Sequence, residues 1–267
     1  MTVEKGQNSR KATRGAGRAS PHADSGFDTL TGKVHAEIRN SIIDGHYLPG
    51  EKLRIEHLKR DYGVSSSTLR EALTMLTRDR LVIAEGQRGF RVKTVSAEDL
   101  IDLSRIRIVL EKEAIHQAIA HGDKEWEGEV VSSFHILRRA AEALAGNIGE
   151  KELFDEWERR HRAFHMSLFA AAPSEWTRYF LTLAYQQFER YRRMFQAVAS
   201  EHYNERDIEA EHAGILDAVI ERDADKAAAL LEDHLMRTLN EWVQYYEQLG
   251  ELPVRRKPQP PQAGSEL

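Results

Sequence analysis

Three predicted helices followed by a β-hairpin constrain the fold of this chain more than any other feature. Apolar residues at helical spacing indicate the first helix, and the turn at residues 45–50 ends it. A second short helix ends at Gly63, and serines suited to capping precede a third helix. Two β-prone runs joined by a basic loop complete a pattern that predicts a winged helix-turn-helix over residues 27–95. The apolar positions of the first and third helices are Leu30, Val34, Ile38, Ile42, Leu69, Leu73 and Leu76.

The polar side of the third helix and the loop of the hairpin indicate that this domain binds DNA. The leucine stripe of the third helix leaves its serines and Arg70 on the opposite face, where they can approach bases and phosphates. The loop carries Arg88 and Gly89, which we expect to contact the DNA backbone or the minor groove. A small helical domain with ordinary turns is the alternative for each element alone, but turn, helix and wing agree. The candidate DNA-binding residues are Ser65, Ser66, Ser67, Thr68, Arg70, Arg88 and Gly89.

Charge is divided unevenly along the chain, and the division favours DNA binding by the N-terminal part only. Residues 1–95 hold 17 Lys and Arg against 11 Asp and Glu, whereas the remaining residues hold 21 against 32. Positive charge next to a recognition helix favours phosphate neutralisation and counterion release. Residues 1–26 contain almost no large apolar side chains, and residues 251–267 are rich in proline, so we expect two disordered tails.

Composition argues against several classes of protein. The chain contains no run of eighteen apolar residues that would span a membrane, and its N-terminus lacks the apolar segment of a secretory signal. It also contains no cysteine, which excludes disulfides, thiolate metal sites and cysteine nucleophiles. We therefore expect a cytoplasmic protein without a membrane partner.

Helical periodicity replaces the strand signals from Ser96 onward. Ser96 and Asp99 form a plausible capping box, and Gly146 and Pro173 interrupt the pattern that follows. Short connections between the helices predict an antiparallel six-helix bundle over residues 96–250, so the fold class is mainly α. The predicted helices cover about residues 96–120, 123–145, 150–171, 174–199, 204–220 and 223–248.

Four of the twelve histidines lie on the predicted inward faces of three different helices of this bundle. His161 and His165 are i, i+4 neighbours, a spacing that lets both imidazoles reach one ion. Each buried imidazole needs partners for its ring nitrogens, and a metal ion supplies them for several histidines at once. The alternative for any single histidine is a hydrogen bond to a backbone carbonyl or a carboxylate. The candidate metal ligands are His161, His165, His212 and His234.

Residues 28–93 resemble the winged helix of the GntR family of bacterial regulators. The resemblance rests on Leu48-Pro49-Gly50 before the second helix, on residues 63–73, and on residues 88–92 in the hairpin. Family members commonly carry Arg where this chain has Ser66, so one base-reading guanidinium is missing by comparison. The resemblance implies a homodimer whose two recognition helices enter successive major grooves of a palindromic operator.

The order of a winged helix and about six helices resembles the FadR branch of that family, with its C-terminal FCD domain. The resemblance implies a metal held by an Asp-x-x-x-His pair and two later histidines, which correspond to residues 161 and 165, His212 and His234. Position 161 is His rather than Asp, and this exchange favours Zn²⁺, or else Ni²⁺, over Mn²⁺ or Mg²⁺. Stretches around residues 121–127 and 155–165 are similar to carbon-starvation-induced regulators of this branch.

A metal beside arginines in such a core implies a small carboxylate effector, with a dicarboxylate or hydroxy acid preferred. Arg107 fits the family pattern of an arginine four residues before a glutamate, here Glu111, and Arg192 lies on the fourth helix of the bundle. An i, i+4 salt bridge between Arg107 and Glu111 is the alternative role for that arginine.

These observations predict a DNA-binding transcriptional regulator. The commonest arrangement in the resembled family implies a repressor that leaves its operator when the effector binds. The alternative function is a metal-dependent hydrolase with a nucleic-acid-binding appendage. His161 and His165 share the histidine spacing of the zincin helix, but the glutamate that would act as general base beside the first histidine is absent. We therefore expect no enzymatic activity.

Overall fold

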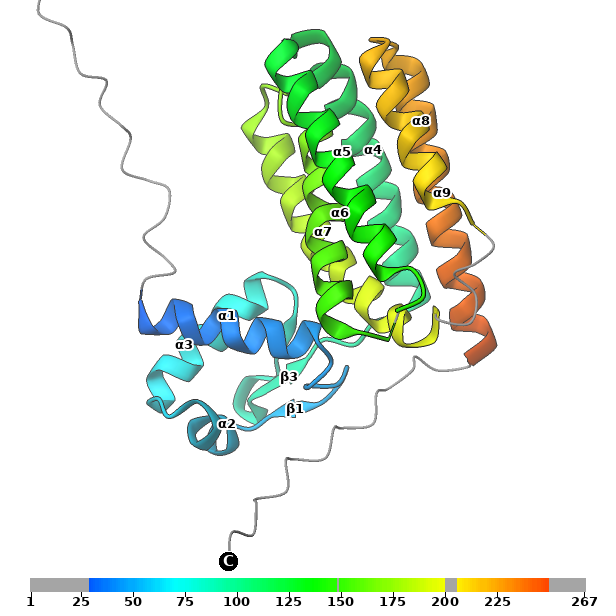
Figure 1. Cartoon of the computed structure of the whole chain (residues 1–267). Coiled ribbons are helices and arrows are strands. Elements are labelled where there is room, and N and C mark those ends of the chain that lie inside the picture. Colours follow the sequence, from blue (N-terminus) through cyan, green and yellow to red (C-terminus); the bar gives the residue numbers. More distant parts are fainter. Residues whose placement is uncertain (1–28, 148, 200–205, 250–267) are drawn as a thin grey trace, which may run out of the picture.

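The computed structural model describes residues 29–147, 149–199 and 206–249. A small N-terminal domain of three helices and a sheet lies at one end of a bundle of long helices (Figure 1). The two predicted tails, residues 1–26 and 251–267, lie outside the described residues. None of the helices in the described segments is long and apolar enough to cross a membrane.

The N-terminal domain contains α1 (Leu30–Ile43), α2 (Ile55–Tyr62) and α3 (Ser66–Arg78). The side chains of Thr29 and Ser65 accept backbone hydrogen bonds at the first turns of α1 and α3, as N-caps do. Gly63 ends α2 with a φ of 64°, a left-handed conformation that glycine adopts without steric cost. The helix-turn-helix therefore follows the capping and breaking residues of the sequence.

The sheet of this domain has one strand more than the predicted hairpin. β1 (Lys52–Leu53), β2 (Val82–Ala84) and β3 (Phe90–Val92) are all antiparallel, in the order β1-β3-β2. Leu53 pairs with Phe90 in register, and Ala84 pairs with Phe90 from the other side. A two-residue strand shows no alternation in the sequence and forms only because β3 provides its partner, which is why the hairpin prediction was incomplete.

Six helices form the described part of the larger domain, and their bounds follow the predicted ranges closely, although the predicted start at residue 204 lies outside the described residues. Ser96, Asp123 and Asp207 accept hydrogen bonds from the first turns of their helices. One predicted helix that we extended to residue 171 ends earlier, at Leu168. The helices are α4 (Ala97–His121), α5 (Lys124–Leu144), α6 (Lys151–Leu168), α7 (Glu175–Ala199), α8 (Ile208–Ile220) and α9 (Ala224–Leu249).

The helix α7 connects the bundle to the N-terminal domain. Glu189 of α7 pairs with Arg39 of α1 at 3.5 Å, and the Gln187 side chain donates to the backbone oxygen of Asp79 at 2.6 Å. Arg190 donates to the backbone oxygen of Lys93, directly after β3. The wing and the end of α3 are therefore both fastened to one helix of the bundle.

Candidate metal centre and DNA-binding surface

The face of α3 opposite its leucine stripe is open to solvent. Leu69 and Leu73 are fully buried, whereas Arg70 is exposed and makes no ion pair within the described parts of the chain. Ser65 caps the helix, and its hydroxyl lies 2.7 Å from that of Ser67 and 2.9 Å from that of Thr68. The predicted DNA-binding residues of this helix therefore share its first turns, with Ser66 half-buried among them.

The wing presents Arg88 at its tip. A short 3₁₀ turn, Gly86–Arg88, connects β2 to β3, and Arg88 is exposed. Gly89 follows with φ 94° and ψ −137°, a conformation that residues with a Cβ rarely adopt. Arg91 donates to Glu85 at 2.8 Å and to the backbone oxygen of Gly50 at 2.6 Å, so this second, partly exposed arginine stabilises the loop.

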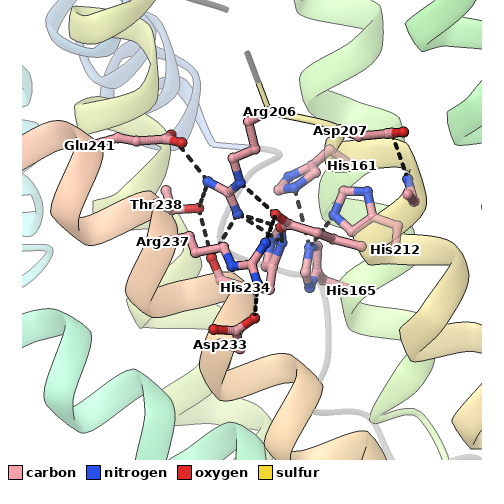
Figure 2. Close-up of polar contacts among 12 residues, drawn as sticks. His161, His165, Arg206, Asp207, His212, Asp233, His234, Arg237, Thr238 and Glu241 are labelled. Atoms are coloured by element: carbon pink, nitrogen blue, oxygen red, sulfur yellow. Dashed lines mark hydrogen bonds and ion pairs between the residues drawn. The ribbon is translucent and has the colours of Figure 1, made fainter.

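Four histidines from three helices meet in the core of the bundle (Figure 2). His161 and His165 come from α6, His212 from α8 and His234 from α9, and all four are buried. The Nε2 atom of His165 lies 3.2 Å from the Nε2 atoms of both His161 and His212. One ligand atom from each of the four histidines falls within 4.8 Å of the others. The structure thus brings together all the predicted metal ligands.

Burial favours the neutral form of these imidazoles. Desolvation, with repulsion from nearby cationic groups, lowers the pKa of His161 and His165 well below the ordinary value of 6.5. Desolvation also lowers the pKa of His212 well below that value, and lowers the pKa of His234. A neutral imidazole has a lone pair for a metal ion, so the set is ready to coordinate without first losing protons.

The distances also fit a shared ion. Bonds of about 2.0–2.1 Å at tetrahedral angles place two nitrogens on one zinc roughly 3.3 Å apart, close to the observed contacts. The buried Nδ1 atoms of His161 and His165 lack hydrogen-bond partners among the described residues, and an ion held at Nε2 would not supply them. Four neutral nitrogen donors suit Zn²⁺ or Ni²⁺ better than Mg²⁺.

Asp155, the aspartate nearest in sequence to His161, does not join the cluster. It pairs instead with Lys151 at 2.6 Å and with Arg193. Its pKa is lowered because these hydrogen bonds and charges outweigh the opposing effect of burial. The imidazole of His161 therefore takes the place that an aspartate occupies in the resembled family pattern.

One carboxylate that the sequence did not single out touches the cluster. Glu211 precedes His212 on α8, and its Oε2 atom lies 2.8 Å from Nδ1 of His234. Arg206 donates to both oxygens of Glu211 and to the backbone oxygen of His234. Glu211 is off the apolar stripe of its helix, so periodicity gave no signal for it, and nothing in the sequence connected Arg206 with α9.

The predicted effector residue Arg107 is buried close to Tyr185. It donates to Glu111 at 2.5 Å, so the salt bridge considered as the alternative role is present. Its guanidinium also lies 4.1 Å from the ring centroid of Tyr185. The atoms Arg107 Nη2, Glu111 Oε2 and Tyr185 Oη remain without a hydrogen-bond partner among the described residues, although all are buried. Such groups cost free energy unless a ligand or water satisfies them.

The second predicted effector residue, Arg192, already forms a buried ion pair with a glutamate of the neighbouring helix. It is buried on α7 and its Nε donates to both oxygens of Glu158, at 2.9 and 2.7 Å. Glu158 lies one helical turn before His161 on α6. The geometry therefore places Arg192 beside the metal-ligand helix, with its charge already paired.

Comparisons with known proteins agree on the family. Residues 30–92 match the model of bacterial regulatory proteins of the gntR family, and residues 102–237 match that of the FCD domain. The chain is 38% identical to the uncharacterized HTH-type transcriptional regulator BphR of Paraburkholderia xenovorans, over 83% of this chain and 89% of that protein. It is 34% identical to the HTH-type transcriptional repressor GlaR of Escherichia coli, over 74% of this chain and 89% of that protein.

A solved structure supports the fold. McbR/YncC of E. coli superposes with a TM-score of 0.66 at 19% identity, covering 82% of this chain and 99% of that one. The matched families and relatives are transcriptional regulators rather than enzymes, which removes the hydrolase alternative. This chain belongs to the GntR family of bacterial regulatory proteins, as a DNA-binding transcriptional regulator with a C-terminal FCD domain.

Proposed function

We propose that this regulator is a homodimeric repressor whose operator affinity is controlled by a small carboxylate bound beside a zinc ion in the bundle. The observation that carries the proposal is the position of His165 Nε2, which lies 3.2 Å from Nε2 of His161 and 3.2 Å from Nε2 of His212. Neutral nitrogens at this spacing are the donor set of a zinc site. The name of the relative GlaR as a repressor supports the direction of regulation.

The carboxylate effector follows from the groups beside the histidines. Arg107 has a buried Nη2 atom to donate, and Tyr185 has a buried hydroxyl. One carboxylate of the effector would accept from these donors, and a second oxygen would add a fifth ligand to the four histidines of the metal. A dicarboxylate or hydroxy acid has the two polar ends that this arrangement requires. Arg192, already paired with Glu158, would connect the ligand helix α6 to α7 when the effector binds.

The contacts of α7 supply a route from the bundle to the DNA-binding domain. Arg192 of this helix pairs with α6, which carries His161 and His165, while Glu189 and Arg190 hold α1 and the end of β3. A shift of α6 on effector binding would therefore move the winged helix through α7. The coupling free energy of such a shift changes operator affinity by the same factor as it changes effector affinity.

The second copy of the chain would cover an exposed apolar face of α4 and α7. Ile106 and Val109 on α4 are 56% and 66% exposed, and Trp176 and Phe180 on α7 are 71% and 46% exposed. Contiguous exposed apolar surface of this kind marks an interaction site. Charges of both signs, Asp102 and Glu113 with Arg105 and Arg178, flank this face, so a two-fold axis can pair them.

The dimer is tested by changing this face without touching the histidines. Phe180→Arg places a charge in the face, and Ile136→Arg on α5, at a similarly exposed isoleucine, is the matched control. Light scattering should give the mass of a dimer for the wild type and the control, and of a monomer for Phe180→Arg. A dimer that survives Phe180→Arg contradicts this interface.

Metal and effector control is tested by melting and operator binding with the full chain. Removing metal with a chelator should lower Tm, and zinc should restore it, because a ligand that binds only the folded state stabilises it. Candidate dicarboxylates and hydroxy acids should then raise Tm further and weaken a gel shift with a fragment of the promoter next to the gene. Melting and operator affinity that do not respond to chelator, zinc or acids contradict the proposal.

A further inference from the structure

A carboxylate and an arginine form a chain of contacts behind one metal ligand. Nδ1 of His234 lies 2.8 Å from Oε2 of Glu211, so this nitrogen is turned away from the other histidines. The ring of His234 nevertheless lies 4.7 Å from that of His212 and 5.2 Å from that of His165. An imidazole held at Nδ1 has only Nε2 left for the cluster.

Arg206 fixes the position of this carboxylate. Its Nη2 lies 2.5 Å from Oε2 of Glu211 and 2.9 Å from the backbone oxygen of His234, and its Nε lies 2.8 Å from Oε1 of Glu211. Its Nη1 donates to Thr238 and Glu241, both on α9 (Figure 2). Nearly every N–H group of this guanidinium therefore donates to Glu211 or to α9, the helix that carries His234.

We propose that Glu211, held by Arg206, is the positioning residue of the metal centre: it accepts the Nδ1 proton of His234 and so directs Nε2 of that histidine to the ion. The proposal rests on the metal centre of the proposed function and adds residues that touch a ligand without being ligands. Metal-bound histidines usually have such a partner, and the hydrogen bond at one nitrogen fixes both the tautomer and the ring orientation.

The charge of Glu211 suits this task. Arg206 donates to both of its oxygens, and a guanidinium paired in this way with a carboxylate favours its ionised form. An ionised acceptor increases the basicity of the imidazole that donates to it, which strengthens metal binding. Both oxygens of Glu211 are already engaged, which disfavours direct coordination by this residue.

The contact of Glu211 with His234 also connects α8 to α9. Glu211 and the ligand His212 are neighbours on α8, while His234 lies on α9. Glu211 on α8 therefore contacts His234 on α9. Arg206, just before α8, makes a second connection to α9 through the backbone oxygen of His234. His161 and His165 have no equivalent, since their Nδ1 atoms lack partners among the described residues.

The test measures zinc affinity of the full-length protein by competition with a chromophoric chelator. Glu211→Gln keeps the shape and removes the charge, and we expect about tenfold weaker zinc binding, within the range for lost partners of metal ligands. Glu211→Ala should lose more, and Arg206→Met less than Glu211→Ala. Glu209→Gln removes an exposed carboxylate from the same turn of α8 and should bind zinc as the wild type does.

Two further measurements separate positioning from a purely structural role. The Co²⁺ absorption spectrum of Glu211→Gln should keep the wild-type band positions, because no ligand is lost. In a double-mutant cycle, Glu211→Gln should weaken zinc binding in the wild type but not in the His234→Ala background. Circular dichroism of the metal-free variants checks that the helices are intact.

The outcomes distinguish this proposal from the one on which it rests. Equal zinc affinity of the wild type and Glu211→Gln overturns the positioning role alone. A changed Co²⁺ spectrum overturns it as well, since Glu211 would then be a ligand, and so does an undiminished effect in the His234→Ala background. A wild-type protein that takes up no zinc refutes the metal centre itself.

Discussion

The two domains of this regulator place their polar groups in opposite ways. In the N-terminal domain the side chains of Leu53, Leu58 and Leu69 and their neighbours fill the core, and the predicted DNA-contacting Arg70 is exposed. His35, paired with Asp79 at 2.5 Å, is the one buried ionisable side chain among the described residues of this domain.

In the bundle, by contrast, polar groups occupy the interior. The buried ionisable residues there are Arg107, Glu111, Glu158, His161, His165, Arg190, Arg192, His212 and His234. Each needs a partner to offset its desolvation, and most of these partners come from another helix. By the proposed function, the first domain keeps its DNA contacts on a surface outside its core, whereas the second holds its metal and effector within the core.

The largest effect that this comparison predicts is the loss of a central histidine. His165 contacts two other cluster members through Nε2, so His165→Ala should weaken zinc binding by at least about 100-fold, more than the loss of a supporting partner does. Chelator competition and bound-metal analysis measure the effect. His135→Ala, at an exposed position on α5, is the control and should leave the affinity unchanged.

The same variant tests whether the two domains are separable. Metal-free His165→Ala should bind operator as metal-free wild type does, because its substitution lies in the bundle core, away from α3 and the wing. An abolished gel shift under these conditions would show that the core of the bundle is needed to hold the DNA-binding surface, and the contrast between the domains would fail.

The next effect in size is on the recognition helix. Arg70→Ala should cost on the order of 1–3 kcal/mol of specific operator binding, with Tm unchanged, because the side chain is exposed and unpaired. Arg78→Ala, at an exposed arginine in the last turn of the same helix, is the matched control. Equal affinities for Arg70→Ala and wild type in a gel-shift titration would remove Arg70 from the contact surface.

The smallest effect is expected at the wing. Arg88→Ala should weaken binding to specific and unrelated DNA alike and should reduce the slope of log affinity against log salt by about one. Gln87→Ala changes the neighbouring exposed position without altering the charge and serves as the control. An Arg88→Ala slope equal to that of wild type would show that this arginine makes no phosphate contact.

The sequence predicted the N-terminal domain well because its signals are local. Leucine spacing, an N-cap serine and Gly63 each act within a few residues, and the structure places them as expected. The strand β1 was missed because Lys52 and Leu53 become a strand only when β3 lies beside them. For the bundle, helical spacing was enough to place four histidines on inward faces.

Helical spacing and capping motifs could not identify the residues that we propose to support the metal centre. Glu211 and Arg206 look like ordinary surface charges in the sequence, and their role depends on the distance between α8 and α9. Likewise, the pairing of Arg192 with Glu158 joins residues 34 positions apart on two helices. Interactions between helices depend on how those helices pack, and the packing is not encoded in any short stretch.

The amino-acid sequence by itself determined the family, the order of the two domains, the exposed face of α3 and the four histidines. These depend on helical periodicity, capping and short motifs, all of which are properties of neighbouring residues. Only the tertiary structure decided that Nε2 of His165 lies 3.2 Å from the Nε2 atoms of His161 and His212. It also decided that Glu211 contacts Nδ1 of His234. The physical reason is burial. A polar group removed from water costs free energy unless another part of the folded chain lies close enough to replace its hydrogen bonds to water.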